Sequence, residues 1–130
     1  VKPCENTIYN IHDGLDIKLI TRLRSVFSHL REHKFRHNFR DTLNPMCDCS
    51  LEPESTIHFL LHCQIYYDLR ITLMSDLDAL DSSISLLDDD NLGVLMLYGD
   101  KKYNLMINQK ILQATIKFLK DSARFDGALF

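Results

Sequence analysis

The chain has little of what marks membrane, secreted or nucleotide-binding proteins. No apolar run approaches the roughly 20 residues that cross a bilayer. The beginning, VKPCENTIYN, lacks the charged segment and apolar stretch of a secretory signal. We therefore expect an intracellular protein, in the nucleus, the cytoplasm or both, with no membrane partner. The sequence also lacks an initiator methionine, so we expect a fragment, a processed product or the tail of a longer protein.

Glycine is also scarce, with four among 130 residues. The chain contains no phosphate-binding glycine loop, no dinucleotide fingerprint and no nucleophile elbow. Its 45% of hydrophobic and 25% of charged residues are typical of a globular protein. At this length the simplest organisation is a single domain over residues 1–130 with a substantial core.

Three of the four cysteines lie close to a histidine in the run CDCSLEPESTIHFLLHC. The spacing is C-x-C-x8-H-x4-C, formed by Cys47, Cys49, His58 and Cys63. Thiolate and imidazole are the ligands of structural Zn²⁺, and four of them complete a tetrahedron. The alternative is that the cysteines are small core hydrophobes. Two further ligands at suitable spacing favour zinc in a reducing compartment, and Cys4 is then a free thiol.

The fourth ligand stays open on geometry. His58 and His62 are four residues apart and share a helix face, so His62 is an alternative to Cys63. His58 and Cys63 lie roughly 140° apart around an ideal helix, so either the backbone adjusts or His58 stands at the helix start. Thiolate is the stronger ligand, which favours Cys63. Four protein ligands leave no position for a catalytic water, which disfavours a metal-dependent hydrolase. We expect no enzymatic activity, because the chain also lacks polymerase and nuclease motifs.

The apolar periodicity predicts an all-α fold of about five helices. Residues 14–43 form basic helices, and a zinc-knuckle segment over 45–63 follows. The first helix has an apolar stripe and a polar face that includes His29 and His33. A second, short helix ends at Asn44-Pro45, because the residue before a proline avoids the α region. The apolar stripe of the first helix consists of Leu15, Leu19, Leu23, Phe27 and Leu30.

The second half reads as an acidic helical region over 64–100 and a C-terminal helix over 104–123. A helix beginning near Pro53–Thr56 continues past the cysteines, because its apolar period persists to Leu80, and it breaks at 81–83. Asp88–Asp90 start a short helix that ends at Gly99, since carboxylates oppose the positive end of the helix dipole. The last helix has a solvated stripe formed by Lys110, Gln113, Lys117, Lys120 and Arg124.

Charge is uneven along the chain although the net charge is −3. Residues 18–40 hold seven basic side chains and one acidic side chain, whereas 64–100 are strongly acidic. Cations alternate with Phe35 and Phe39, so phosphates could meet the cations and bases could stack on the rings. For the phenylalanines we favour the alternative, that they belong to the core. The candidate nucleic-acid-binding residues are Lys18, Arg22, Arg24, Lys34, Arg36 and Arg40.

These motifs occur in a characteristic order. A basic helix, TRLRSVFSHLREHKFRHNF, precedes Asn44-Pro45, then come C-x-C, an acidic spacer, HFLLHC and YYDLR. The order resembles the C-terminal zinc-knuckle tail of LINE-type (non-LTR) retrotransposon reverse transcriptases, from about Leu15 to Leu77. The segment from Asn104 to Phe125 also resembles the closing helix of such proteins.

The resemblance implies a structural zinc bound by Cys47, Cys49, His58 and Cys63, with Arg70 matching an arginine that follows the ligands. It also implies a non-catalytic segment that binds RNA, single-stranded DNA or target DNA beside an upstream polymerase domain. The chain lacks the paired aspartates that polymerisation requires, typically in the motif Y-x-D-D. The most similar segment, Tyr98-Gly99-Asp100-Lys101, has no second aspartate. Two alternatives are a zinc-stabilised helical module that binds protein, and an inactive retroelement remnant.

Overall fold

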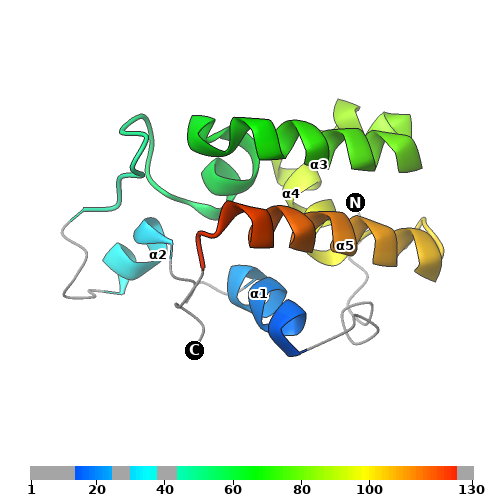
Figure 1. Cartoon of the computed structure of the whole chain (residues 1–130), viewed down its shortest axis with the longest axis horizontal. Coiled ribbons are helices and arrows are strands. Elements are labelled where there is room, and N and C mark those ends of the chain that lie inside the picture. Colours follow the sequence, from blue (N-terminus) through cyan, green and yellow to red (C-terminus); the bar gives the residue numbers. More distant parts are fainter. Residues whose placement is uncertain (1–13, 25–29, 38–43, 126–130) are drawn as a thin grey trace.

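The computed structural model describes residues 14–24, 30–37 and 44–125. This part of the chain is helical, which confirms the all-α prediction; its one extended pairing is an isolated bridge between Met46 and Pro53. Figure 1 shows the arrangement. In chain order the helices are α1 (Gly14–Arg24), α2 (Arg31–Arg36), the π-helix η2 (His58–His62), the 3₁₀-helices η3 (Gln64–Tyr66) and η4 (Ser82–Leu86), which flank α3 (Tyr67–Leu80), and then α4 (Asp89–Tyr98) and α5 (Leu105–Ser122).

Helix α5 is central to the core. It lies between α3 and α1 in Figure 1 and also packs against α4. One face is apolar and buried, because Ile111, Leu112, Ile116 and Leu119 recur at helical spacing. The opposite stripe of Lys110, Gln113, Lys117 and Lys120 is exposed, as the sequence predicts. Arg124 was wrongly assigned to that stripe, because its side chain forms hydrogen bonds with the buried carboxylate of Glu54.

The ends of α4 and α5 are fixed by local capping. The side chain of Asp88 accepts a hydrogen bond from Asn91 N at 2.9 Å, and that of Asn104 accepts one from Ile107 N at 2.9 Å. Helix α4 ends at Gly99, whose φ of 72° lies in the left-handed region. A Cβ at Gly99 would also lie 2.5 Å from Asn108 Oδ1. The predicted bounds of both helices are therefore confirmed to within about a residue.

The central helix predicted from Pro53–Thr56 to Leu80 is wrong as one continuous element. Cys63 has an extended backbone, with ψ of 122°, and separates η2 from η3 and α3. The expected break at 81–83 is confirmed, because α3 ends at Leu80 and the backbone of Asp81 is extended. The separate 3₁₀-helix η4 follows, and Asp81 caps it by accepting a hydrogen bond from Ser83 N.

The basic helices differ from the prediction for 14–43. Leu30 is buried but extended, at the start of the separate helix α2, so it does not continue the stripe of α1. His33 is buried rather than on a polar face. Phe35 is 45% exposed, so the preference for a core role was wrong for this residue. The predictions for Phe39, Arg40 and Cys4 fall outside the described residues.

Within the described ranges, none of the helices combines the length and the apolar character that a membrane crossing requires. The most apolar surfaces of these helices instead face one shared core.

The turn after α3 is tied to the turn before α5. Tyr103 donates a hydrogen bond from its hydroxyl to Asp81 Oδ2 at 2.6 Å. This bond, with two further bonds from Ser83, lowers the pKa of the Asp81 carboxyl from 3.8 to about 2. A lowered carboxyl pKa stabilises the folded state at pH values above the unfolded pKa, and the stabilisation disappears as pH falls through the folded pKa.

We expect Tyr103→Phe to raise the pKa of Asp81 toward 3.8, because the strongest donor to its carboxylate is removed. The difference in unfolding free energy between wild type and variant should shrink as pH falls from 3.8 to about 2. NMR titration of the Asp81 carboxyl carbon and urea unfolding at several pH values measure the two effects. An unchanged Asp81 pKa in the variant would contradict the bond.

Candidate metal centre

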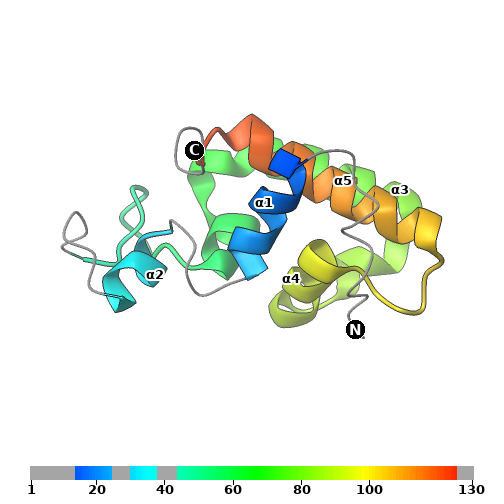
Figure 2. The same cartoon turned by 90° about the horizontal axis from the view of Figure 1, so that it is seen from below.

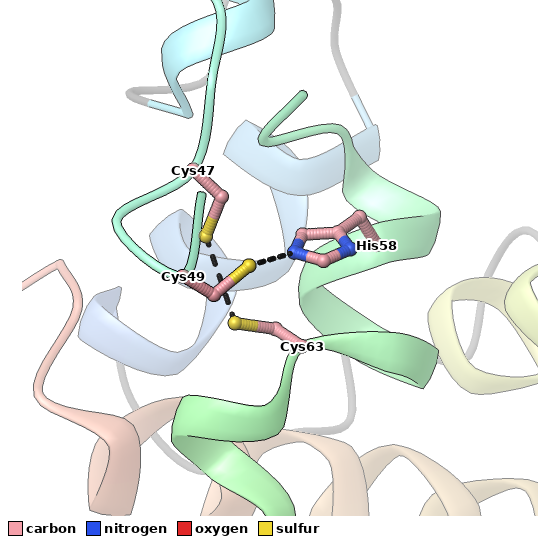
Figure 3. A group of neighbouring side chains, drawn as sticks. All are labelled: Cys47, Cys49, His58 and Cys63. Atoms are coloured by element: carbon pink, nitrogen blue, oxygen red, sulfur yellow. Dashed lines mark hydrogen bonds between the residues drawn. The ribbon is translucent and has the colours of Figure 1, made fainter. Parts of the chain in front are cut away.

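The structure gathers the three cysteines and one histidine of the sequence motif into a single cluster (Figure 3). One ligand atom from each of Cys47, Cys49, His58 and Cys63 lies within 4.8 Å of all the others. The Sγ atoms of Cys47 and Cys63 are 3.6 Å apart, and Cys49 Sγ is 3.2 Å from His58 Nε2. Sulfur ligands of a tetrahedral zinc ion lie about 3.8 Å apart. The cluster therefore has the size of a metal site and could bind an ion.

A tight loop presents the first two cysteines. Met46 and Pro53 form an antiparallel bridge, and inside it Cys47 N donates to Glu52 O at 2.9 Å. Ser50 N donates to Cys47 O at 2.9 Å, and Ser50 has a φ of 64°. This left-handed residue reverses the chain directly after the second cysteine. The reversal turns both thiols of the short C-x-C toward the same point.

A π-turn presents the second pair of ligands. His58 stands near the start of the helical segment, and Cys63 N donates to His58 O at 2.7 Å across five residues. A π-helix inserts one extra residue into a helical turn, so residues five apart come onto one side. The π-turn is therefore the backbone adjustment that two ligands five residues apart require, and it lies directly between His58 and Cys63.

Glu52 orients the imidazole of His58 from behind. His58 Nδ1 lies 3.2 Å from Glu52 Oε2, while Nε2 faces the thiols. A histidine that binds a metal through one ring nitrogen commonly donates the other N–H to a carboxylate, which fixes the tautomer and ring plane. His58 is buried, with 3% exposure, so its ring direction is well defined by its surroundings.

His62, the alternative ligand, lies outside the cluster. Its Nε2 is 2.6 Å from Asp89 Oδ2 on α4, and its side chain is 42% exposed. The contact with Asp89 holds the His62 ring against α4, away from the three thiols. The structure thus brings Cys63 to the site and leaves His62 at the surface.

Arg70 forms hydrogen bonds with the C-terminal end of η2, the helix that carries His58. Its buried guanidinium donates to the carbonyl oxygens of Leu60, Cys63 and Phe59 at 2.8, 2.8 and 3.0 Å. These carbonyls stand at a helix end, where intrahelical partners are missing. Burial lowers the pKa of Arg70, since removal from water disfavours the charged form. One side chain on α3 thereby holds the backbone of a ligand in place.

Glu54 anchors the loop to the chain before it and to the end of α5. Its buried carboxylate accepts hydrogen bonds from Arg31 N at 2.8 Å and from Arg124 Nε at 2.9 Å. The bond to Glu54 raises the pKa of Arg124. Arg31 also donates to Met46 O at 3.1 Å and pairs with Asp48 at 2.6 Å. Helix α2, which begins at Arg31, is therefore attached to the cysteine loop at 46–53.

The thiols of the cluster occupy unlike environments. Burial raises the pKa of Cys47 to about 12, whereas the backbone N–H of Leu51 lowers the pKa of Cys49. A bound cation reverses the effect of burial, because it stabilises the thiolate directly. Metal binding should thus release protons, and metal affinity should fall as pH is lowered.

The predicted nucleic-acid-binding residues differ in their exposure to solvent. Lys18 and Arg22 are exposed one turn apart on α1, and Arg36 is exposed on α2, where Lys34 is half-buried. The guanidinium of Arg24 donates to Leu97 O at 2.6 and 2.8 Å and lies over the Tyr98 ring, so its side chain is engaged within the fold. Arg40 lies outside the described residues.

Three residues of the site region were missed: Glu52, Glu54 and Arg31. The partners of Glu54 lie 23 and 70 positions away, so no local pattern marks it. Glu52 lies six residues before His58, and an acidic spacer residue so close to a ligand histidine is the one signal that was available.

Comparison of the chain with family models, with curated proteins and with solved structures finds no match.

Metal dependence is the first test of the cluster. We expect a strong chelator to lower the melting temperature and the helical circular dichroism, because metal-binding free energy adds to folding free energy. We expect His58→Ala to lose stoichiometric metal, measured by elemental analysis of the purified protein. His62→Ala is the matched control and should keep the metal, since it removes a histidine of the same helix that lies outside the cluster. Equal metal content in the two variants would exclude His58 as a ligand.

The second test concerns Arg70. We expect Arg70→Met to reduce the unfolding free energy by about 3 kcal/mol, because three buried carbonyls lose a charged donor. Urea unfolding of the metal-loaded protein measures the change. Arg22→Met on the exposed face of α1 is the control and should change stability by less than about 0.5 kcal/mol. A loss of the same size in both variants would contradict the anchoring role.

Proposed function

We propose that the chain is a non-catalytic module in which a structural Zn²⁺ positions a surface that binds nucleic acid. The metal part rests on the cluster of three thiols and one imidazole, which is the donor set of structural zinc sites. Zinc prefers sulfur and nitrogen ligands in a tetrahedron, whereas calcium and magnesium require oxygen. All four coordination positions would be filled by protein, so no water remains for catalysis.

The nucleic-acid part rests on one observation: Phe35 is exposed between two cationic residues on α2. A buried position would be normal for phenylalanine, and exposure to solvent makes the ring available for stacking with a base. Lys34 and Arg36 flank it in sequence and supply charge for phosphates. Arg36 pairs with Glu32 one turn earlier, and such an exposed pair is weak enough to exchange for a phosphate.

The attachment of α2 to the cysteine loop at 46–53 allows so short a helix to present these residues. Helix α2 has six residues, too few for stability alone. It is attached through Arg31 and the backbone bond from Glu32 N to Glu54 O at 3.2 Å. Figures 1 and 2 both show α2 and the loop together at one end of the molecule. Metal binding would therefore govern the position of the proposed surface.

The motif order supports a particular context for this module, the C-terminal zinc-knuckle tail of a LINE-type reverse transcriptase. In that context it would hold RNA or target DNA near an active site on an upstream domain. Arg70 supports the same context, since an arginine after the ligands belongs to the resembled pattern and here fixes the ligand helix.

We expect Phe35→Ala to weaken binding of a single-stranded oligouridine RNA about tenfold, because one stacking contact is lost. We expect Arg36→Glu to weaken it and to reduce its salt dependence. Fluorescence anisotropy over a range of salt concentrations measures both.

Lys101→Glu is the matched control, because it makes the same charge change at an exposed residue remote in sequence from α2. It should have a small effect. Affinity that does not change with salt, or that falls equally in Arg36→Glu and Lys101→Glu, would exclude α2 as the binding surface.

A further inference from the structure

Helix α3 carries an exposed apolar stripe that borders its core contacts. Tyr67 and Ile71 are 60% and 52% exposed, and Met74 is half-buried. With Arg70, Ser75 and Asp78 they line an open groove of about 490 Å³. Leu73 and Leu77 of the same helix are buried in the core. A groove lined by neighbouring exposed apolar side chains favours association with another apolar surface.

The spacing of the stripe is that of a helix-pairing seam. Tyr67, Ile71, Met74 and Asp78 follow one another at intervals of four, three and four residues. This alternation averages 3.5 residues, the repeat by which a helix packs along a second helix. Helix α3 has 14 residues, long enough to offer two heptads. An occupant of the groove would thus be a helix lying along α3.

The exposed charged side chains of α3 on the side of the seam are acidic. Asp78 lines the groove, and Asp68 is exposed next to Tyr67. Asp76 lies on another side of α3, beside Lys117 of α5. Arg70 does not balance Asp68 and Asp78 at the surface, because its guanidinium is buried and bonded to three carbonyl oxygens. Asp78 lies within the seam itself, where a charged residue selects a partner of opposite charge.

We propose that this groove binds a basic amphipathic helix of a partner protein, which places apolar side chains on Tyr67, Ile71 and Met74 and a lysine or arginine against Asp78. A helix seated in a groove through residues at such spacing is a common mode of peptide recognition. Methionine suits such a surface because its flexible thioether adapts to the shape of the ligand.

Charge argues against a second copy of the chain as the occupant. Pairing α3 with α3 of another molecule would bring aspartates together on both helices, and like charges across a helix interface are unfavourable. The proposed nucleic-acid surface on α2 and this groove also use different residues, so the two interactions can be tested separately.

The probe is a blocked peptide of the length of α3, with leucines at alternating spacings of four and three, alanines elsewhere and lysines on both flanks. A second peptide has glutamates in place of the lysines. We expect the lysine peptide to bind the metal-loaded protein saturably in fluorescence anisotropy and the glutamate peptide not to bind. We expect Ile71→Asp to weaken binding at least tenfold. Phe35→Ala should leave it unchanged.

Thr72→Asp is the matched control, because it adds the same charge to the adjacent exposed residue of α3, which does not line the groove. It should bind the peptide at least as tightly as wild type does. Absence of saturable binding, equal binding of the two peptides, or equal loss in Ile71→Asp and Thr72→Asp would each overturn the proposal. So would self-association in analytical ultracentrifugation that Ile71→Asp abolishes, since the occupant would then be a second copy.

Discussion

The contact between the loop at 46–53 and the turn from His58 to Cys63 is the interaction on which the candidate site depends. Most side chains of that loop are exposed, and Cys47 is the fully buried one. Ordering each residue costs about 1–2 kcal/mol of backbone entropy, which an exposed loop cannot recover from apolar burial. Coordination of one ion by both segments would provide the missing free energy, so the loop and everything attached to it would follow the metal.

Two chains of contacts lead outward from this centre. Toward the N-terminal side, Arg31 and Glu54 connect the loop to α2, where Phe35 is exposed. Toward the other side, Arg70 connects the backbone of Cys63 to α3 and also lines the apolar groove of that helix. The two proposed binding surfaces thus share one structural support. A module of this kind could hold a nucleic acid and a protein helix in a fixed mutual orientation.

Features governed by neighbours in sequence were predictable. The caps at Asp88 and Asn104, and the end of α4 at Gly99, depend on hydrogen bonds and torsions within a few residues. The Cys and His motif also belongs to this class, because all four residues fall within one short segment. The break at Cys63 was missed because the apolar period runs through it. Phe35 was misjudged because exposure depends on which elements cover a helix, and α2 lies at the end of the molecule.

By itself, the sequence determined the helical class, the ends of α4 and α5 and the set of residues able to bind a metal. Tertiary structure decided between Cys63 and His62 at the cluster, because a π-turn stabilised by Arg70 sets which side chains converge. It also decided the roles of the charged residues: Arg24 and Arg124 serve internal bonds, while Lys18 and Arg22 stay at the surface. A charge has the same local signature in either role. The two roles are distinguished only by a partner that is distant in sequence. A buried charge needs such a partner, because burial without one would cost several kcal/mol.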